Sequence, residues 1–161
     1  MIICGIDPGL SGGVAIISQR KILRGFRMPV MVDPMSRKKK KVVNINKLAA
    51  ELAAVDIDMT VVERVHAMPG QGVTSMFSFG VAYGQALAVA TLKPDRSGGV
   101  VQITPQAWKG YFGLKGSDKG ASIAKAQEVF GDSYKWKYLA DNGIAEAALM
   151  AQCYLDKNEQ M

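Results

Sequence analysis

Residues 1–18 read MIICGIDPGLSGGVAIIS, and they contain the two strands that decide the fold. The apolar runs at residues 2–7 and 14–18 are separated by a segment rich in proline, glycine and serine, which is typical of two strands joined by a tight turn. A third apolar run at residues 22–28 ends before Pro29 and extends this pair. The amino-terminal segment therefore predicts a three-stranded antiparallel meander.

Beyond the meander, the hydrophobic pattern alternates between helix and strand. Apolar residues recur at helical spacing over residues 46–55, with Asn46 placed to cap the first turn. The β-branched runs at residues 60–65 and 100–104 predict buried parallel strands. Further helices are predicted at residues 73–92, 121–130 and 144–156. The glycine-rich segment that follows Pro105 is expected to be a loop.

The order of these elements predicts an α/β fold. A three-stranded meander followed by two parallel strands, flanked by helices, is the arrangement of the ribonuclease H-like fold and of each half of the actin-like ATPases. We expect a five-stranded mixed sheet in a single domain that spans residues 1–161, because a chain of this length buries one hydrophobic core.

The composition indicates where in the cell the protein is expected and which kind of partner it is expected to bind. No stretch of about 18 apolar residues is free of glycine, charged or polar breaks, so no membrane span is expected. The first residues predict a strand rather than a signal peptide, and the distant Cys4 and Cys153 favour a reducing, cytoplasmic location. Twenty Lys and Arg against 14 Asp and Glu give a net charge of +6, which favours a polyanionic partner.

The helix expected between Val73 and Leu92 is apolar on nearly all sides. Gly80 and Gly84 are small positions at which another backbone could approach. Two interpretations stay open: a central core helix, or a core helix that also forms a dimer interface.

Four acidic residues occur where apolar elements begin or end. Asp7 ends the first strand, Glu63 lies near the end of a later strand, and Asp141 and Glu146 flank the start of the last helix. Burying several carboxylates together is unfavourable unless a cation neutralises them. The four residues are therefore candidate ligands of Mg²⁺ or Mn²⁺, which prefer oxygen, and two such ions would support hydrolysis of a phosphodiester.

Each carboxylate also has an interpretation without chemistry. Asp7 stands in an Asp-Pro-Gly turn sequence, and Glu63 could be an exposed charge paired with the adjoining arginine. Asp141 could cap the last helix, and Glu146 could be a solvated residue of its first turn, favoured by the helix dipole. Both interpretations stay open for each residue.

From end to end, these motifs resemble the RuvC family of Holliday junction resolvases. The resemblance rests on GIDPG at residues 5–9, SGGVA at residues 11–15, Glu63, Asp141 and EAAL at residues 146–149. It implies that Asp7 bridges two metal ions, that Glu63 is the strand glutamate of the site, and that Glu146 is the last acid, on the closing helix. The family has a second acid three residues earlier, where this chain has Gly143, and Asp141 is expected to replace it.

Basic residues supply the contacts expected with DNA. The resemblance implies that Lys109 and Lys119 contact the region of the scissile phosphate and stabilise developing negative charge, with Lys115 in the same basic segment. An ordinary solvated loop is the alternative. His66, three residues after Glu63, takes the place of a family aromatic residue that stacks on unpaired bases, or it is an uninvolved loop histidine.

A run of five consecutive positive charges consists of Arg37, Lys38, Lys39, Lys40 and Lys41. Mutual repulsion is expected to keep this run in a solvated, mobile loop. It is interpreted either as a sequence-independent clamp on the phosphate backbone or as a solvated linker.

The function expected from the resemblance is that of a crossover junction endodeoxyribonuclease in DNA recombination and repair. A homodimer, paired through the helix between Val73 and Leu92, would use two Mg²⁺ or Mn²⁺ ions per site to nick opposing strands of a four-way junction symmetrically. One alternative is a catalytically silent DNA-binding scaffold. Another is a fragment of an actin-like kinase or ATPase, with GIDPGLSGG as its phosphate loop, although no second copy of this loop is visible.

Overall fold

The computed structural model describes residues 1–67, 70–92, 99–137 and 139–159, and within them the side chains of all but Lys119. The strands are β1 (Ile2–Asp7), β2 (Gly13–Ser18), β3 (Lys21–Arg27), β4 (Val30–Val32), β5 (Lys41–Val43), β6 (Met59–Glu63) and β7 (Val100–Ile103). The helices are α1 (Ile45–Ala53), α2 (Val73–Thr91), α3 (Pro105–Tyr111), α4 (Lys119–Phe130) and α5 (Asn142–Asn158), and a short 3-10 turn, η1 (Gly131–Ser133), follows α4.

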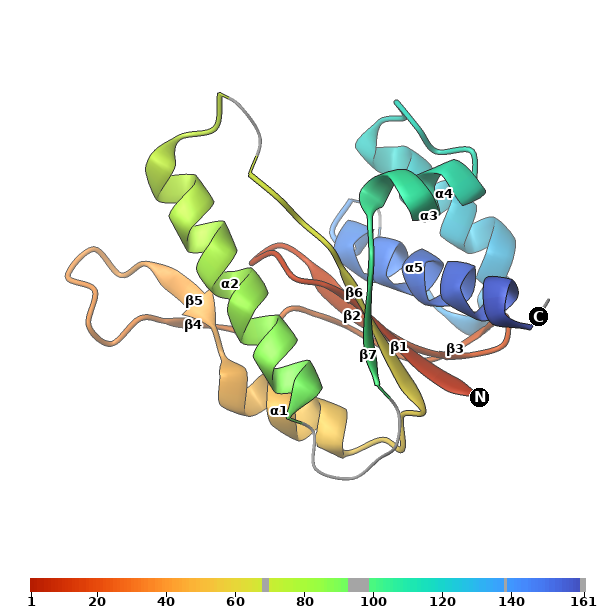
Figure 1. Cartoon of the computed structure of the whole chain (residues 1–161), viewed down its shortest axis with the longest axis horizontal. Coiled ribbons are helices and arrows are strands. Elements are labelled where there is room, and N and C mark those ends of the chain that lie inside the picture. The colour runs from red at the N-terminus through yellow and green to blue at the C-terminus, as the bar shows by residue number, and fades with distance from the viewer. Residues whose placement is uncertain (68–69, 93–98, 138, 160–161) are drawn as a thin grey trace.

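The main sheet has five strands in the order β3-β2-β1-β6-β7 (Figure 1). β1 pairs with β2 and β2 with β3 in antiparallel fashion, whereas β1 pairs with β6 and β6 with β7 in parallel. This is the mixed sheet predicted from the sequence, and its three-stranded meander is confirmed.

Apolar side chains cover both faces of this sheet, so the alternating residues of one strand enter two different cores. Ile3 packs with α3, α4 and α5, whereas Cys4 and Ile6 pack with α1 and α2. Figure 1 shows α1 and α2 on one side of the sheet and α3, α4 and α5 on the other. A strand buried on both faces is nearly continuously apolar, as the sequence of β1 is.

The helix at the centre of the fold is α5 and not α2. Eleven residues of α5 are buried, but only Ala82, Ala86 and Ala90 of α2 are. Phe77 is 74% exposed on α2. The sequence interpretation of α2 as a central core helix is therefore wrong: an apolar composition does not by itself show which face a helix buries.

By length and composition alone, α2 is also the one helix in the described part of the chain that could cross a membrane. Its three buried alanines pack against the apolar core that it shares with α1 and the sheet. The same test is passed by helices of folded domains, so it is weak evidence for a span.

Three local features differ from the sequence predictions. Asn44 caps α1 by accepting a hydrogen bond from the backbone N–H of Lys47, so Asn46 is not the cap. The segment after Pro105 begins with α3 rather than a loop. The five positive charges lie at the end of a β-hairpin formed by β4 and β5, and the last of them belongs to β5.

Candidate active site

Two acidic residues meet at the carboxyl ends of parallel strands. β1 and β6 are neighbours in register, with Ile6 beside Val62, and the next residues are Asp7 and Glu63. Because side chains alternate along a strand, both acids lie on the face that packs against α5. The convergence expected of these two acids follows from the parallel pairing.

A third acid reaches this edge because α5 packs unusually close to β1. A Cβ atom at Gly5 would lie 1.9 Å from the carbonyl oxygen of Ala147, so only glycine permits this approach. Glu146 precedes Ala147 on α5, and its negative charge raises the pKa of both Asp7 and Glu63. The three carboxylates therefore form one electrostatic group, which we call the acid cluster.

The carboxyl group of Asp7 is the most strongly perturbed member of the acid cluster. Burial, followed by the charges of Glu63 and Glu146, raises its pKa from 3.8 to about 8, against the lowering effects of a backbone hydrogen bond from Gly9 and of Lys109. At neutral pH the isolated protein thus keeps a proton on Asp7, which a bound cation would displace.

Glu63 is buried and is held by an indole group. The Nε1 atom of Trp108 donates a hydrogen bond to its Oε1 at 2.9 Å. Burial raises the pKa of Glu63 and the charge of Glu146 adds to this, while the indole hydrogen bond and Lys109 lower the pKa. Glu63 as a whole residue is only 9% exposed, so its side-chain orientation is set by this donor.

Glu146 is contacted by two further helices. Ser122 of α4 donates a hydrogen bond to its Oε1 at 3.1 Å, and the Nζ atom of Lys109 of α3 lies 3.8 Å from the same oxygen. Lys109 thereby brings a positive charge to the acid cluster, where it can interact with a phosphate that approaches the carboxylates.

Asp141 is not brought into the acid cluster. The guanidinium of Arg27 contacts its Oδ1 at 3.2 Å, and the backbone N–H of Lys137 donates to its Oδ2 at 2.8 Å. It stands at the N-cap of α5 but makes no side-chain capping bond. Its described partners give Asp141 a role in holding the start of α5 to β3.

Gly143, which stands where the sequence resemblance implies an acid, has no room for a side chain. A Cβ atom there would lie 2.5 Å from the carbonyl carbon of Gly12, and the two glycines form a β-bridge. The absence of an acid at position 143 is therefore a consequence of the close contact between α5 and the turn after β1. An acid at position 143 would require the backbone to separate.

Divalent cations fit the acid cluster by donor chemistry. Its carboxylates supply hard oxygen atoms, and their mutual repulsion and burial favour a bound cation. As these side chains stand, no group of three His, Cys, Asp or Glu in the described parts of the chain could enclose an ion. The structure thus shows charges that a cation would stabilise, without showing a closed coordination shell.

Basic side chains border the acid cluster on the side of α3. Lys109 and Lys115 line a hollow of about 290 Å³ together with Pro105, Gln106 and Gly116. The side chain of Lys119 lies outside the described part of the structure, although its backbone begins α4. His66 is exposed, three residues beyond Glu63.

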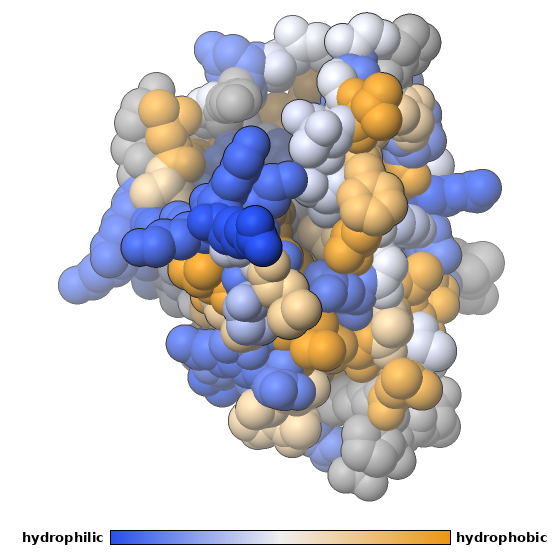
Figure 2. Space-filling view, turned by 90° about the vertical axis from the view of Figure 1, so that its left-hand side faces the viewer, coloured by the Kyte–Doolittle hydropathy of each residue, from blue (hydrophilic) through white to orange (hydrophobic). Residues whose placement is uncertain are grey.

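The basic hairpin of β4 and β5 is connected with the turn after Asp7 by a second hollow, of about 440 Å³. Its lining is Gly9, Leu10, Ser11, Lys41, Ser75, Ser78 and Phe79. Arg37 and the four lysines that follow are all exposed, and Figure 2 shows long hydrophilic side chains on this face beside a run of apolar residues. Lys39 and Lys40 hydrogen-bond through their backbone N–H groups to Ser36, so the run is a defined turn rather than an open loop.

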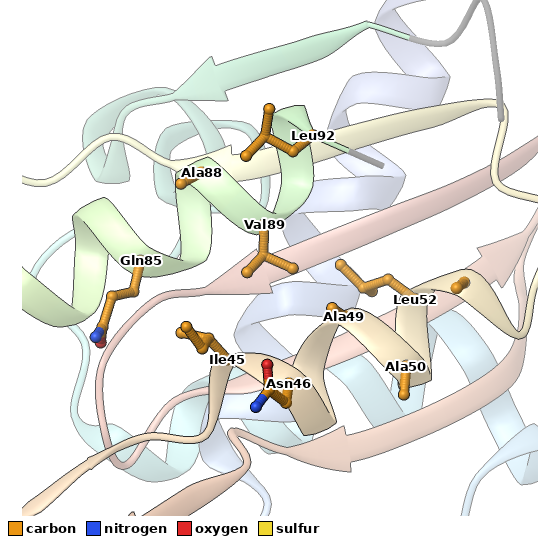
Figure 3. Close-up of a pocket in the computed structure, with 10 residues that line it drawn as sticks. Ile45, Asn46, Ala49, Ala50, Leu52, Gln85, Ala88, Val89 and Leu92 are labelled. Atoms are coloured by element: carbon orange, nitrogen blue, oxygen red, sulfur yellow. The ribbon is translucent and has the colours of Figure 1, made fainter. Parts of the chain in front are cut away.

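An apolar groove of about 550 Å³ lies between α1 and α2, and no carboxylate is among its lining residues. Figure 3 shows Ile45 and Leu52 of α1 facing Val89 of α2 across it. No titratable residue lines this groove, so it offers no group for acid, base or metal chemistry.

The sequence assigned no role to two residues that contact the acid cluster, Trp108 and Ser122. Trp108 belongs to the segment that was expected to be a glycine-rich loop, whereas Ser122 lies in the helix predicted at residues 121–130. A helix signal was present: Thr104 is a capping residue followed by Pro105, the arrangement that begins α3. Recognising it would have placed Trp108 and Lys109 on a helix that leaves strand β7 beside Glu63.

Comparisons with solved structures relate the whole arrangement to known proteins. Thermus thermophilus RuvC in complex with a Holliday junction substrate matches with a TM-score of 0.66 and 16% identity over 99% of this chain and 96% of that chain. A second Thermus thermophilus RuvC structure matches with a TM-score of 0.64 and 16% identity over the same shares. The yeast mitochondrial Holliday junction resolvase matches with a TM-score of 0.51 and 12% identity, over 98% of this chain and 79% of that chain.

No family model matches the sequence, and no curated protein does so either. At 12–16% identity the structural likeness establishes the fold. The chain has the RuvC-like, ribonuclease H-like fold that its sequence predicted.

Proposed function

We propose that this protein is a divalent-cation-dependent DNA endonuclease that cuts four-way junctions. The observation that carries the proposal is the acid cluster of Asp7, Glu63 and Glu146, with Lys109 beside it, at the carboxyl edge of a RuvC-like sheet. The structurally similar proteins are Holliday junction resolvases, and one of them was solved with a junction substrate.

In this proposal Asp7, Glu63 and Glu146 hold Mg²⁺ or Mn²⁺, with two ions per site. Bound cations supply Lewis acidity and an activated water for hydrolysis of a phosphodiester. The chain itself fixes the carboxylates through Trp108 and Ser122 and provides Lys109 for the charge that develops on the phosphate. Asp141 is not proposed as a ligand, because Arg27 and a backbone N–H already occupy its oxygens.

The DNA backbone is proposed to run from the acid cluster along two basic borders. Lys109, Lys115 and Lys119 would contact phosphates beside α3 and α4, and His66 would contact bases near the branch point. The hairpin residues Arg37, Lys38, Lys39, Lys40 and Lys41 would hold a neighbouring duplex arm. Support for the hairpin comes from Lys41, which shares a hollow with the turn after Asp7.

A homodimer formed through α2 is proposed to cut both strands. Gly80, Gly84 and Ala88 follow one another at intervals of four residues along the exposed side of α2, next to exposed Phe77. A Cβ atom at either glycine would meet no atom within 4 Å, so another backbone has room to approach. A two-fold dimer would match the near two-fold symmetry of a junction.

The deciding experiment compares the wild type with Asp7→Asn on a synthetic four-way junction and a linear duplex, with Mg²⁺ or Mn²⁺. The wild type should produce paired, symmetric nicks in the junction and leave the duplex intact. Asp7→Asn should bind the junction, but its cleavage rate should fall. Replacing a residue that only supports a metal ligand costs roughly 10- to 100-fold, and loss of the ligand itself should cost more. Because Asp7 is protonated in the isolated protein, neutral asparagine should fold normally.

Asp132→Asn, which changes an exposed acid of η1, is the matched control and should cleave like the wild type. Tight junction binding without cleavage by the wild type would replace the nuclease with a silent scaffold. Neither binding nor cleavage would overturn the proposal as a whole.

A further inference from the structure

Helix α3 brings an uncharged donor to the acid cluster from a distant part of the sequence. Trp108 is completely buried, and its indole N–H meets the carboxylate of Glu63, 45 residues earlier in the chain. Hydrogen bonds between two buried side chains are uncommon, and each one restricts the rotamers of both partners.

The backbone fixes both ends of this hydrogen bond. Glu63, the last residue of β6, pairs with Ile103, the last residue of β7, and α3 begins two residues later at Pro105. Thr104 caps α3 by accepting a hydrogen bond from the backbone N–H of Ala107. Trp108 therefore stands one turn into a capped helix whose origin is anchored to the strand that carries Glu63.

The indole group is suited to orient a carboxylate that binds a cation. It donates one hydrogen bond, cannot itself bind a cation through nitrogen, and carries no charge that would compete with one. It occupies Oε1 of Glu63, and no donor to Oε2 is found among the described residues. One oxygen is thus held by the protein while the other is left for a ligand.

We propose that Trp108 is a positioning residue that orients Glu63 for divalent-cation binding. This inference rests on the proposed function, in which Glu63 is a metal ligand. It also explains the sequence order Trp108-Lys109 on α3: one residue orients Glu63, and the next brings a positive charge to Glu146. Partners that orient ligands in this way are worth about 10- to 100-fold in metal affinity.

The test is the affinity of metal-free protein for Mn²⁺, measured by calorimetry without DNA. Trp108→Phe removes the N–H and should weaken Mn²⁺ binding by about 10-fold or more. Trp136→Phe is the matched control, because the Nε1 atom of Trp136 is buried without a hydrogen-bond partner in the described structure, and it should bind Mn²⁺ like the wild type. Equal affinity of the Trp108→Phe variant and the wild type would overturn the inference.

The variant Glu63→Gln distinguishes a positioning role of Trp108 from a merely structural one. If Trp108 acts through the carboxylate of Glu63, Trp108→Phe should cause no further loss of Mn²⁺ affinity in that background. A further loss as large as that seen in the wild type would overturn the inference. Should Trp108→Phe fail to fold, benzothienylalanine at position 108 keeps the bicyclic ring, lacks the N–H, and is expected to give the same loss.

Failure of this inference is distinguishable from failure of the proposed function. Mn²⁺ binding and junction cleavage by the wild type, with unchanged binding by the Trp108→Phe variant, would overturn only the role of Trp108. No Mn²⁺ binding by the wild type would overturn the metal site itself, and this inference with it.

Discussion

The carboxyl group of Asp7 lies away from water and close to two other acids, and both effects raise its pKa to about 8. Its neighbours Gly5 and Gly13 have no side chains, which lets α5 approach the sheet closely enough to place Glu146 nearby. The same closeness excludes a side chain at Gly143. Single glycines thus determine the position of the third acid, Glu146, and exclude a fourth acid at position 143.

The raised pKa of Asp7 predicts how the metal-free protein responds to pH. The folded state keeps a proton that the unfolded chain releases near pH 4, so this contribution to stability is complete below about pH 4 and is lost as the pH rises through about 8. In the presence of a chelator, the melting temperature of the wild type should fall between about pH 4 and about pH 8, and Asp7→Asn should flatten this fall. Parallel curves for the two proteins would contradict the assignment of the proton to Asp7.

At the scale of elements, α3 and the β4–β5 hairpin place side chains around the acid cluster and the turn after Asp7. α3 contacts the acid cluster through Trp108 and Lys109, and the hairpin carries five exposed positive charges, of which Lys41 shares a hollow with the turn after Asp7. The hairpin strands pair only with each other in a separate two-stranded sheet. Changes at the hairpin tip should therefore leave the main sheet intact.

The hairpin is expected to contribute to DNA binding by charge alone. Replacing Lys38, Lys39 and Lys40 by glutamine should weaken junction binding, and the slope of log affinity against log salt should fall by about 0.9 for each phosphate that the variant no longer neutralises. The effect should be the same for junctions of different sequence. The measurement is a salt titration of binding by fluorescence anisotropy.

The matched control neutralises three exposed lysines elsewhere, Lys21, Lys47 and Lys157. It has the same net charge as the hairpin variant. If both triple variants lower the slope equally, net charge rather than the hairpin accounts for binding, and the clamp is refuted.

For the whole molecule, the exposed apolar side of α2 is the feature that a monomer leaves unexplained. Val73 is 85% exposed and Phe77 is 74% exposed. Gly80 and Gly84, which follow them on the helix, face open space. This exposed apolar side is the surface through which the proposed dimer would pair. With one acid cluster in each copy, pairing through α2 would give the two cuts that resolving a junction requires.

The dimer is tested by Gly84→Glu. No atom lies within 4 Å of a Cβ at this position, and glutamate has the higher helix propensity, so the isolated fold should tolerate the change. Analytical ultracentrifugation should show a dimer for the wild type and a monomer for the variant. The monomer should nick a junction on one strand at a time instead of making paired cuts.

Ala124→Glu, on the exposed side of α4, places the same charge on another helix and should remain dimeric. A wild type that sediments as a monomer at concentrations that support cleavage would exclude the α2 dimer.

Local patterns in the sequence determined the order of the strands, the mixed sheet and the positions of Asp7 and Glu63, because alternation and turn residues act over a few neighbours. Only the tertiary structure decided the remaining features. α2 and α5 are both apolar in sequence, but the small residues of α5 and Gly5 permit the closer packing that makes α5 central. The partners of Asp141 and Glu63, Arg27 and Trp108, are distant along the chain, and no local pattern encodes a contact between distant side chains.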